Sequence, residues 1–246
     1  FPALFVGVLA LILLAVGAAA IPTDPTLQPH SDANVAAVSG SDLYAPIALA
    51  GKSAVVFDMA SGKTLYALNA DVQLPLASLA KVALVAAAAE VLSSESSITL
   101  PRDIRGTQGA LLKAGERLRV RDIMDYTLVA SSNDGAELLA ELADEPLRAR
   151  YPTWNDHPTL SRMNALAQEL GLTQTYFLNV SGLDVSTTLS GSYGSARDIA
   201  TLFAYAASAY PGVFSETARD GILLTSENGA ETSARNTNEV EGEIPG

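Results

Sequence analysis

Ser78 and Lys81 stand three residues apart, just before a run of Ala, Val and Leu. At the head of a helix, this spacing places both side chains on one face. A serine hydroxyl is a weak nucleophile until a base lies within hydrogen-bond reach, and a lysine shielded from water loses its proton more easily. The helix N-terminus would add partial positive charge where an attacked carbonyl becomes an oxyanion. The pair therefore predicts acyl-transfer chemistry, although a helix-capping serine followed by a solvent-facing lysine has the same spacing.

Composition limits the classes of partner and cofactor. The chain has 246 residues, a formal net charge of −12 and only four lysines, which argues against a nucleic-acid partner. It has no cysteine, so disulfides and thiolate metal sites are excluded. His30 and His157 are far apart, so neither a histidine zinc centre nor a Ser-His-Asp triad is supported. Composition therefore speaks against these two kinds of metal site.

The N-terminal part of the chain predicts export. Residues 1–21 carry no charge and are long enough to cross a bilayer, while Ala18-Ala19-Ala20 resembles a signal-peptide cleavage site. We expect either a transmembrane signal anchor or a signal peptide, and hence a protein at the cell membrane or elsewhere in the cell envelope. Residues 22–45 are proline-containing and aperiodic, which predicts an extended linker before a folded domain at 46–246.

The elements around the serine and lysine follow from local patterns. Strand-like runs at 53–59 and 64–68 flank a turn and predict a β-hairpin. The helix that begins at Ser78 is expected to extend to about Leu92 and, being apolar nearly all round, to be buried.

A second pair of polar residues follows in the chain. Residues 120–129 predict a helix, and the next helix is expected at 136–142. Ser131 and Asn133 would then lie on a short interhelical loop, where polar side chains can reach a cleft. Elsewhere we expect, in order, a loop at 146–157, a helix at 159–170 capped by Gly171, a helix at 195–210 and a strand at 221–225.

With these residues placed, the sequence resembles the serine D-alanyl-D-alanine carboxypeptidases, the low-molecular-mass penicillin-binding proteins of the peptidase S11 family. Their signatures are Ser-x-x-Lys, Ser-x-Asn and Lys-Thr-Gly, in that order, and the first two match Ser78–Lys81 and Ser131–Asn133. The likeness runs from about Ala54 to Gly246. It also includes the stretches Leu74–Ala77, Lys113–Leu118, Asp134–Ala136, Met163-Asn164, Leu170-Gly171, Phe177–Asn179, Gly182-Leu183, Ser195–Asp198 and Asn236–Asn238. A second Ser-x-Asn, at 226–228, lies in turn-like sequence and is interpreted as chance.

The resemblance implies an α/β fold of the β-lactamase and DD-peptidase type, in which an antiparallel sheet, begun by the 53–68 hairpin, packs on the Ser78 helix beside a helical subdomain. It implies that Ser78 attacks the penultimate D-Ala carbonyl of a peptidoglycan stem peptide, the terminal D-Ala leaves, and water hydrolyses the acyl-enzyme. Lys81 would take the Ser78 proton, Ser131 would relay a proton to the leaving amine, and Asn133 would hold Lys81 and the substrate amide. β-Lactam antibiotics would be inhibitors, and no metal would be needed.

The third signature is not found where the family places it. No Lys-Thr-Gly follows Asn236-Thr237-Asn238, and the sequence does not begin with Met. We therefore expect a fragment of a longer gene product, with the last strands of the sheet beyond Gly246. Without the residues that would bind the substrate's terminal carboxylate and complete the oxyanion hole, the polypeptide is expected to be incomplete as a catalyst.

Three other functions stay open. A class A β-lactamase-like hydrolase shares the first signature, but no Glu-x-x-Leu-Asn segment is present to activate a deacylating water. A DD-endopeptidase of the same family would cut cross-links, and the sequence hardly separates it from a carboxypeptidase. A non-catalytic cell-envelope binding module could keep the fold without the activity.

Overall fold

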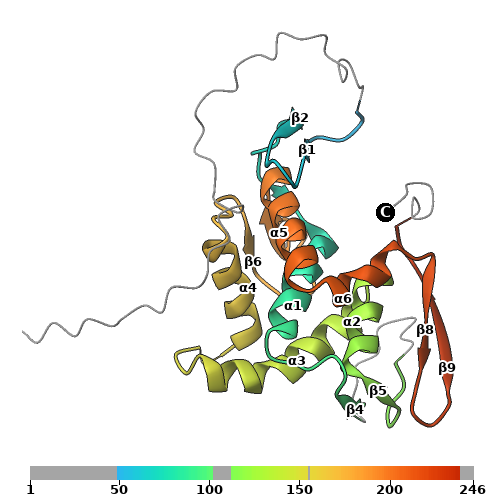
Figure 1. Cartoon of the computed structure of the whole chain (residues 1–246). Coiled ribbons are helices and arrows are strands. Elements are labelled where there is room, and N and C mark those ends of the chain that lie inside the picture. Colours follow the sequence, from blue (N-terminus) through green and yellow to red (C-terminus); the bar gives the residue numbers. More distant parts are fainter. Residues whose placement is uncertain (1–48, 102–111, 155, 239–246) are drawn as a thin grey trace, which may run out of the picture. The chain divides into compact units, whose positions relative to one another are not determined.

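The computed structural model describes residues 49–101, 112–154 and 156–238 (Figure 1). All of them belong to one unit of the chain, Ala36–Gly246. The predicted membrane segment at 1–21 and the predicted linker at 22–45 lie outside the described residues. Among the helices of the described ranges, none combines the length and the hydrophobicity that a bilayer span requires.

The predicted hairpin is confirmed. Strands β1 (Ala54–Phe57) and β2 (Thr64–Leu68) pair antiparallel, and the turn between them contains Gly62 at φ 69°, a conformation that suits glycine. The hairpin contacts α5 (Ala196–Ala209) in the structure, where the sequence predicts packing on the helix that begins at Ser78.

The helix expected from Ser78 to Leu92 is shorter than predicted. A 3-10 turn, η2 (Ala77–Leu79), leads into α1 (Ala80–Ala89). Beyond α1 the chain continues as a turn, in which Val91 N and Leu92 N both donate to Ala88 O, at 3.1 Å and 2.9 Å. Ser78 therefore lies in the tight turn before α1 and not within the α-helix itself.

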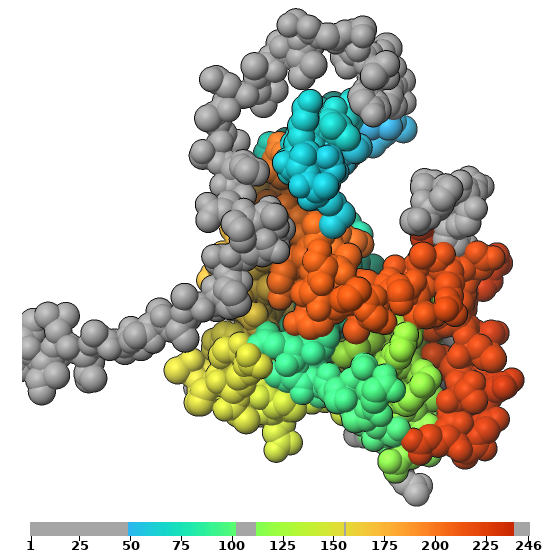
Figure 2. Space-filling view, viewed as in Figure 1, coloured from blue at the N-terminus to red at the C-terminus, as the bar shows by residue number. Residues whose placement is uncertain are grey.

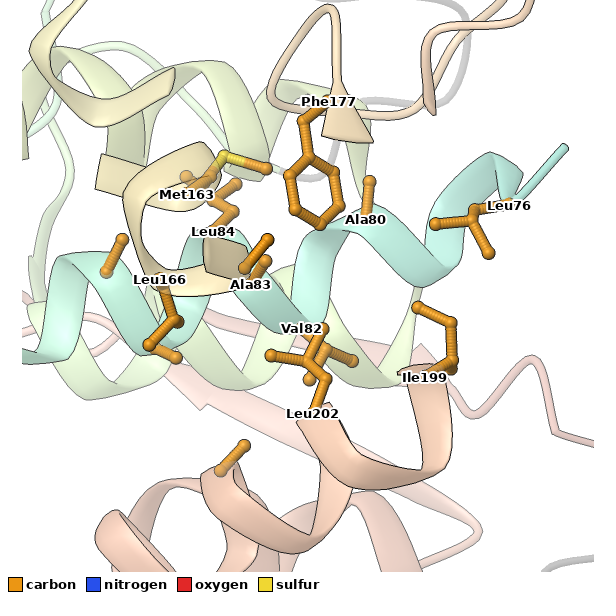
Figure 3. Packing of buried hydrophobic residues seen from close by; sticks show 14 of the residues in the cluster. Leu76, Ala80, Val82, Ala83, Leu84, Met163, Leu166, Phe177, Ile199 and Leu202 are labelled. Atoms are coloured by element: carbon orange, nitrogen blue, oxygen red, sulfur yellow. The ribbon is translucent and has the colours of Figure 1, made fainter. Parts of the chain in front are cut away.

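Helix α1 is the centre of the core, as its apolar sequence predicts. Its first nine residues, Ala80–Ala88, are all buried. Met163, Phe177 and Leu202 pack with α1 residues in a first cluster, and Val85 of α1 belongs to a second cluster. Figure 3 shows that the first cluster lies on both sides of α1, with Met163 and Phe177 on one side and Leu202 on the other. Because most α1 side chains are alanines, the neighbouring helices approach its backbone closely.

The next two helices differ in how well the sequence predicts them. Helix α2 (Val120–Val129) has the predicted bounds, whereas α3 (Asn133–Arg150) begins earlier and ends later than predicted. The predicted loop at 146–157 is therefore wrong over its first five residues, because α3 continues through Pro146. Proline removes one helical hydrogen bond, but the helix beyond it is held by Leu147, which is fully buried in the second cluster.

Two later helices are close to their predictions. Helix α4 (Pro158–Glu169) is followed by Gly171 at φ 68°, the left-handed conformation expected of a C-cap glycine. Helix α5 begins after Ser195, whose side chain accepts a hydrogen bond from Asp198 N at 3.1 Å. A short helix α6 (Pro211–Phe214) and a 3-10 turn follow.

Among the described residues the strands form four small antiparallel sheets, and together with the helices they give the predicted α/β class. Besides β1–β2 they are β3–β7–β6, β4–β5 and β8–β9. The β8–β9 hairpin, red in Figure 2, lies against α2 and contains the predicted strand at 221–225. The bounds of the remaining strands are Leu74–Pro75 (β3), Ser97–Thr99 (β4), Arg117–Arg119 (β5), Tyr176–Phe177 (β6), Ser192–Gly194 (β7), Gly221–Thr225 (β8) and Glu231–Arg235 (β9).

Asp125 on α2 makes stability depend on pH. Its side chain is buried, and within the described part of the chain its Oδ1 has no hydrogen-bond partner. Burial raises the pKa of Asp125 to about 7; Arg121, whose Nε lies 3.8 Å from Oδ2, opposes the shift, and Glu216 adds to it. Because the pKa is raised by folding, the acid form stabilises the protein at low pH, and this contribution is lost as the pH rises from about 4 to about 7.

We expect Asp125→Asn to stabilise the protein at pH 8 by about 1–2 kcal/mol, because the amide is never charged, and to have little effect at pH 4. The free energy of unfolding in urea, measured for both proteins at the two pH values, checks this. An Asp125→Asn protein that is less stable than the wild type at pH 8 would show that the Arg121 contact outweighs the burial of the charge.

Candidate functional site

Ser78 is presented to solvent by a turn with an unusual backbone. The residue before it, Ala77, has φ 49°, a left-handed conformation that is uncommon outside glycine. This turn is held by its neighbours: Leu76 N donates to Ser192 O at 3.1 Å, and Ser192 Oγ donates to Ala77 O at 3.4 Å. The Ser78 side chain is exposed as a result, whereas Leu76 behind it is buried.

Lys81 is buried and makes three hydrogen bonds of equal length. Its Nζ lies 2.9 Å from Ser78 Oγ, 2.9 Å from Asn133 Oδ1 and 2.9 Å from the backbone carbonyl of Ser181. Only 2% of the residue is accessible to water. Burial lowers the pKa of Lys81 to about 8, and the negative charge of Glu137 opposes that shift. With this pKa, about a tenth of the amine is neutral at pH 7, and the neutral form can accept the Ser78 proton.

Asn133 reaches Lys81 from the start of a helix and not from a loop as predicted. It is the first residue of α3, and the preceding Ser132 is the N-cap, whose Oγ accepts from Gly135 N at 3.0 Å. The cap fixes the first turn of α3 and so fixes where the amide of Asn133 lies. Only Ser131 remains in the predicted interhelical loop, with φ 54°.

Ser131 lines the same cavity as Ser78 and Lys81, and within the described residues it makes no hydrogen bond to either. Among the residues that the structure describes, no hydrogen bond is made by the Ser131 hydroxyl. The cavity has a volume of about 490 Å³. It is lined by apolar side chains together with hydroxyl, amine and amide groups; the lining residues are Leu76, Ser78, Leu79, Lys81, Val82, Thr127, Leu128, Ser131, Phe203, Phe214, Thr217 and Asn236–Asn238.

Two parts of the site are not predicted from the sequence. The Ser181 carbonyl is a backbone group, and residue type gives no signal for it. The segment Asn236–Asn238 is tied to the helix before Ser131, because Thr237 N donates to Val129 O at 3.0 Å.

The second Ser-x-Asn, at 226–228, lies in the β8–β9 turn, where Ser226 Oγ bonds Asn228 and Ala230.

Acidic groups near the site are dispersed. Across residues 49–101, 112–154 and 156–238, no three histidine, aspartate or glutamate side chains are grouped so that they could hold a metal ion.

Residues 40–243 match the model of the Peptidase S11 family, D-alanyl-D-alanine carboxypeptidase. The chain is 30% identical to D-alanyl-D-alanine carboxypeptidase DacC of Escherichia coli K12 over 65% of its own length and 43% of the relative's. It is 31% identical to DacB2 of Mycobacterium tuberculosis H37Rv over 71% of its length and 56% of the relative's. It thus spans about half the length of these relatives.

Solved structures give the same result for the fold. A D-alanyl-D-alanine carboxypeptidase from M. tuberculosis H37Rv superposes with a TM-score of 0.65 at 29% identity, covering 79% of this chain and 69% of the other. Penicillin-binding protein D2 from Listeria monocytogenes, in its ampicillin-bound form, superposes with a TM-score of 0.64 at 28% identity, covering 81% and 77%.

Proposed function

Because this chain belongs to the D-alanyl-D-alanine carboxypeptidase family, peptidase S11, we propose that its protein is a serine enzyme that removes the terminal D-Ala of peptidoglycan stem peptides. The predicted resemblance and the predicted DD-peptidase type of α/β fold are both confirmed. The observation that most directly supports this activity is the 2.9 Å contact between the Ser78 hydroxyl and the buried Lys81 amine, whose pKa is lowered to about 8.

In the proposed mechanism, Ser78 Oγ attacks the carbonyl carbon of the penultimate D-Ala while Lys81 Nζ takes the hydroxyl proton. The backbone N–H of Ser78 supplies one donor to the oxyanion. The bond to the terminal D-Ala then breaks, and its nitrogen leaves as an amine after receiving a proton through Ser131. Water attacks the resulting ester, and the shortened peptide leaves with Ser78 restored.

The roles of Ser131 and Asn133 differ in how directly the geometry supports them. Asn133 Oδ1 already bonds Lys81, which leaves its amide N–H₂ for a substrate carbonyl. Ser131 lines the cavity, and its proposed proton relay requires a bound substrate to bridge from its hydroxyl to the leaving nitrogen. We assign Ser78, Lys81 and Ser131 as catalytic and Asn133 as substrate-binding.

The proposal extends to inhibitors, location and domains. β-Lactam antibiotics would acylate Ser78, and a relative of the same fold has been solved in complex with ampicillin and with cefotaxime. Since peptidoglycan lies outside the cytoplasm, we propose a cell-envelope protein with its catalytic domain at 46–246. Residues 22–45 would be a linker, and residues 1–21 a signal peptide or a membrane anchor.

One relative supports an alternative activity. The chain is 29% identical to a D-alanyl-D-alanine endopeptidase of Pseudomonas aeruginosa PAO1 over 63% of its length and 46% of the relative's. The acyl-enzyme chemistry would be the same, but the leaving amine would belong to a cross-linked peptide and not to free D-Ala.

The Lys-Thr-Gly signature does not occur in residues 1–246. By the resemblance, this motif would bind the substrate's terminal carboxylate and supply the second oxyanion donor. We therefore propose that residues 1–246 by themselves turn over little or no substrate. Catalysis is therefore to be measured on the full-length protein, with residues 1–246 as a separate sample.

We expect the full-length protein to release D-Ala from a peptide that ends in D-Ala-D-Ala, and to carry fluorescent penicillin as an ester on the tryptic peptide that contains Ser78. Release of D-Ala is followed enzymatically and the adduct by mass spectrometry. Hydrolysis of a cross-linked dimer without hydrolysis of the pentapeptide would favour the endopeptidase. Absence of both reactions, with no penicillin adduct, would favour a non-catalytic binding module.

A further inference from the structure

The carbonyl that contacts Lys81 belongs to a tight segment at residues 179–183, which we call the Asn179 turn. Both ends of the Asn179 side chain bond the backbone of this turn. Its Nδ2 donates to Leu183 O at 2.7 Å, and its Oδ1 accepts from Gly182 N at 2.7 Å. These two hydrogen bonds link residue 179 to residues 182 and 183 and so close the turn.

The Gly182 N–H and the Ser181 carbonyl belong to the same peptide group. A peptide group is planar and trans, so its N–H and its C=O point in opposite directions. Asn179 holds the N–H end and Lys81 Nζ bonds the C=O end at 2.9 Å. Fixing the N–H on Asn179 therefore fixes the direction of the carbonyl toward Lys81.

The Asn179 turn also packs tightly against the backbone before the nucleophile. Gly182 has φ +80°, and a Cβ there would lie 1.9 Å from the carbonyl oxygen of Ala77. Only glycine allows this approach, so the turn touches the backbone of the residue that precedes Ser78. The same peptide group that bonds Lys81 is therefore also packed against the left-handed turn that presents Ser78.

Asn179 itself has little room to move. A Cβ at Gly191 would lie 2.5 Å from Asn179 Nδ2 and 2.1 Å from Leu183 O, so the backbone of Gly191 lies directly against the bonded pair. In addition, Asn179 N donates to Gly191 O at 3.2 Å. The half-buried side chain therefore lies between its own turn and the chain leading into β7.

We propose that Asn179 is a positioning residue for the proposed acyl transfer. Its side chain accepts a hydrogen bond from Gly182 N and so orients the Ser181 carbonyl toward Lys81. This carbonyl in turn keeps the Lys81 amine within hydrogen-bond distance of Ser78. This rests on the proposed function for its effect on catalysis, but its effect on Lys81 is measurable without catalysis. The Ser181 side chain has only a minor part, because its hydroxyl contacts in the turn are long, at 3.4 Å to Asn179 and 3.5 Å to Leu183 N.

The test uses the four lysines of the chain. In the full-length protein labelled with lysine carrying ¹³C at Cε, the Lys81 signal is assigned by its loss in Lys81→Arg, and its titration is followed by NMR. Losing an acceptor destabilises the ammonium, so we expect Asn179→Ala to move the Lys81 titration to lower pH by about 0.5–1 unit. The plateau rate of penicillin acylation should fall about tenfold or more, because a misplaced base costs rate steeply.

Asn164→Ala is the matched control. Asn164 also bonds backbone through both ends of its amide, to Phe177 O at 2.9 Å and from Phe177 N at 2.9 Å, and none of its hydrogen bonds goes to residues 179–183. It should lose comparable stability while the Lys81 titration and the acylation plateau stay as in the wild type. Asn179→Asp keeps an acceptor for Gly182 N and loses the donor to Leu183 O, so its plateau should lie between those of the wild type and Asn179→Ala.

The positioning role would be overturned if Asn179→Ala and Asn164→Ala showed the same Lys81 titration and the same acylation plateau. If the alanine variant does not fold, Asn179→Leu, which has a similar volume but no acceptor for Gly182 N, takes its place: a wild-type plateau would overturn the positioning role, and a reduced plateau would support it. A wild-type protein that is not acylated at all would instead refute the proposed function, and the NMR titration would still decide whether Asn179 positions the carbonyl.

Discussion

Replacing Ser78 by alanine is expected to abolish covalent labelling by fluorescent penicillin and release of D-Ala, with a loss of more than about 10⁴-fold relative to the wild type. The hydroxyl is the atom that would carry the acyl group, and within the described residues no other serine hydroxyl bonds Lys81. Because Ser78 is exposed and its hydroxyl is bonded only to Lys81, stability should change by no more than about 0.5 kcal/mol.

The control for this variant is Ser61→Ala, in the exposed turn of the β1–β2 hairpin, which should label like the wild type. Labelling is read from gel fluorescence after equal exposure times, and folding from thermal unfolding. A Ser78→Ala protein that still forms a stable penicillin adduct would require a different nucleophile and would remove the basis of the proposed mechanism.

Replacing Lys81 by arginine should be nearly as severe, lowering the rate constant of acylation by about 10²–10⁴-fold. Arginine keeps the positive charge but does not deprotonate in proteins, so it offers no base to Ser78. The wild type should show an acylation rate that rises with pH and levels off above about 8, because the pKa of Lys81 is lowered to about 8 and only the neutral amine accepts a proton. The arginine variant should lack this rise.

Second-order rate constants measured with fluorescent penicillin from pH 6 to 10 check both statements. Lys113→Met is the control, because Lys113 is exposed in a turn before β5. A rise with pH that persists unchanged in Lys81→Arg would assign the titration to another group, and Lys81 would then be only a structural cation.

The sequence predicts the helices well where their burial follows from their own periodicity. Helix α2 has the predicted bounds because its apolar residues recur at helical spacing between clear breaks. The extension of α3 through Pro146 was not predictable, because it depends on the burial of Leu147 among residues distant in the chain. The strands β3 and β6 contain two residues each, too few for any periodicity to be visible.

For the site, the sequence predicted the four side chains and the structure supplies their geometry. Ser78, Lys81 and Asn133 come together within hydrogen-bond distance across 52 residues of chain, and Ser131 lines the same cavity. The Ser181 carbonyl could not be predicted, because its direction depends on the Asn179 side chain and on a glycine that packs against Ala77. Backbone groups of this kind follow from tertiary contacts and not from residue type.

The left-handed backbone at Ala77 and at Ser131 has a consequence for ligand binding. Each of these residues departs from the conformation that an L-residue prefers, at a cost of about 1–2 kcal/mol, and each lies at or directly before a serine that lines the cavity. The fold bears this cost before any substrate arrives, so the main chain already sets the direction of the Cα–Cβ bond of each serine. Binding a ligand therefore does not require these two backbone segments to be ordered first, and that part of the entropy cost of binding is avoided.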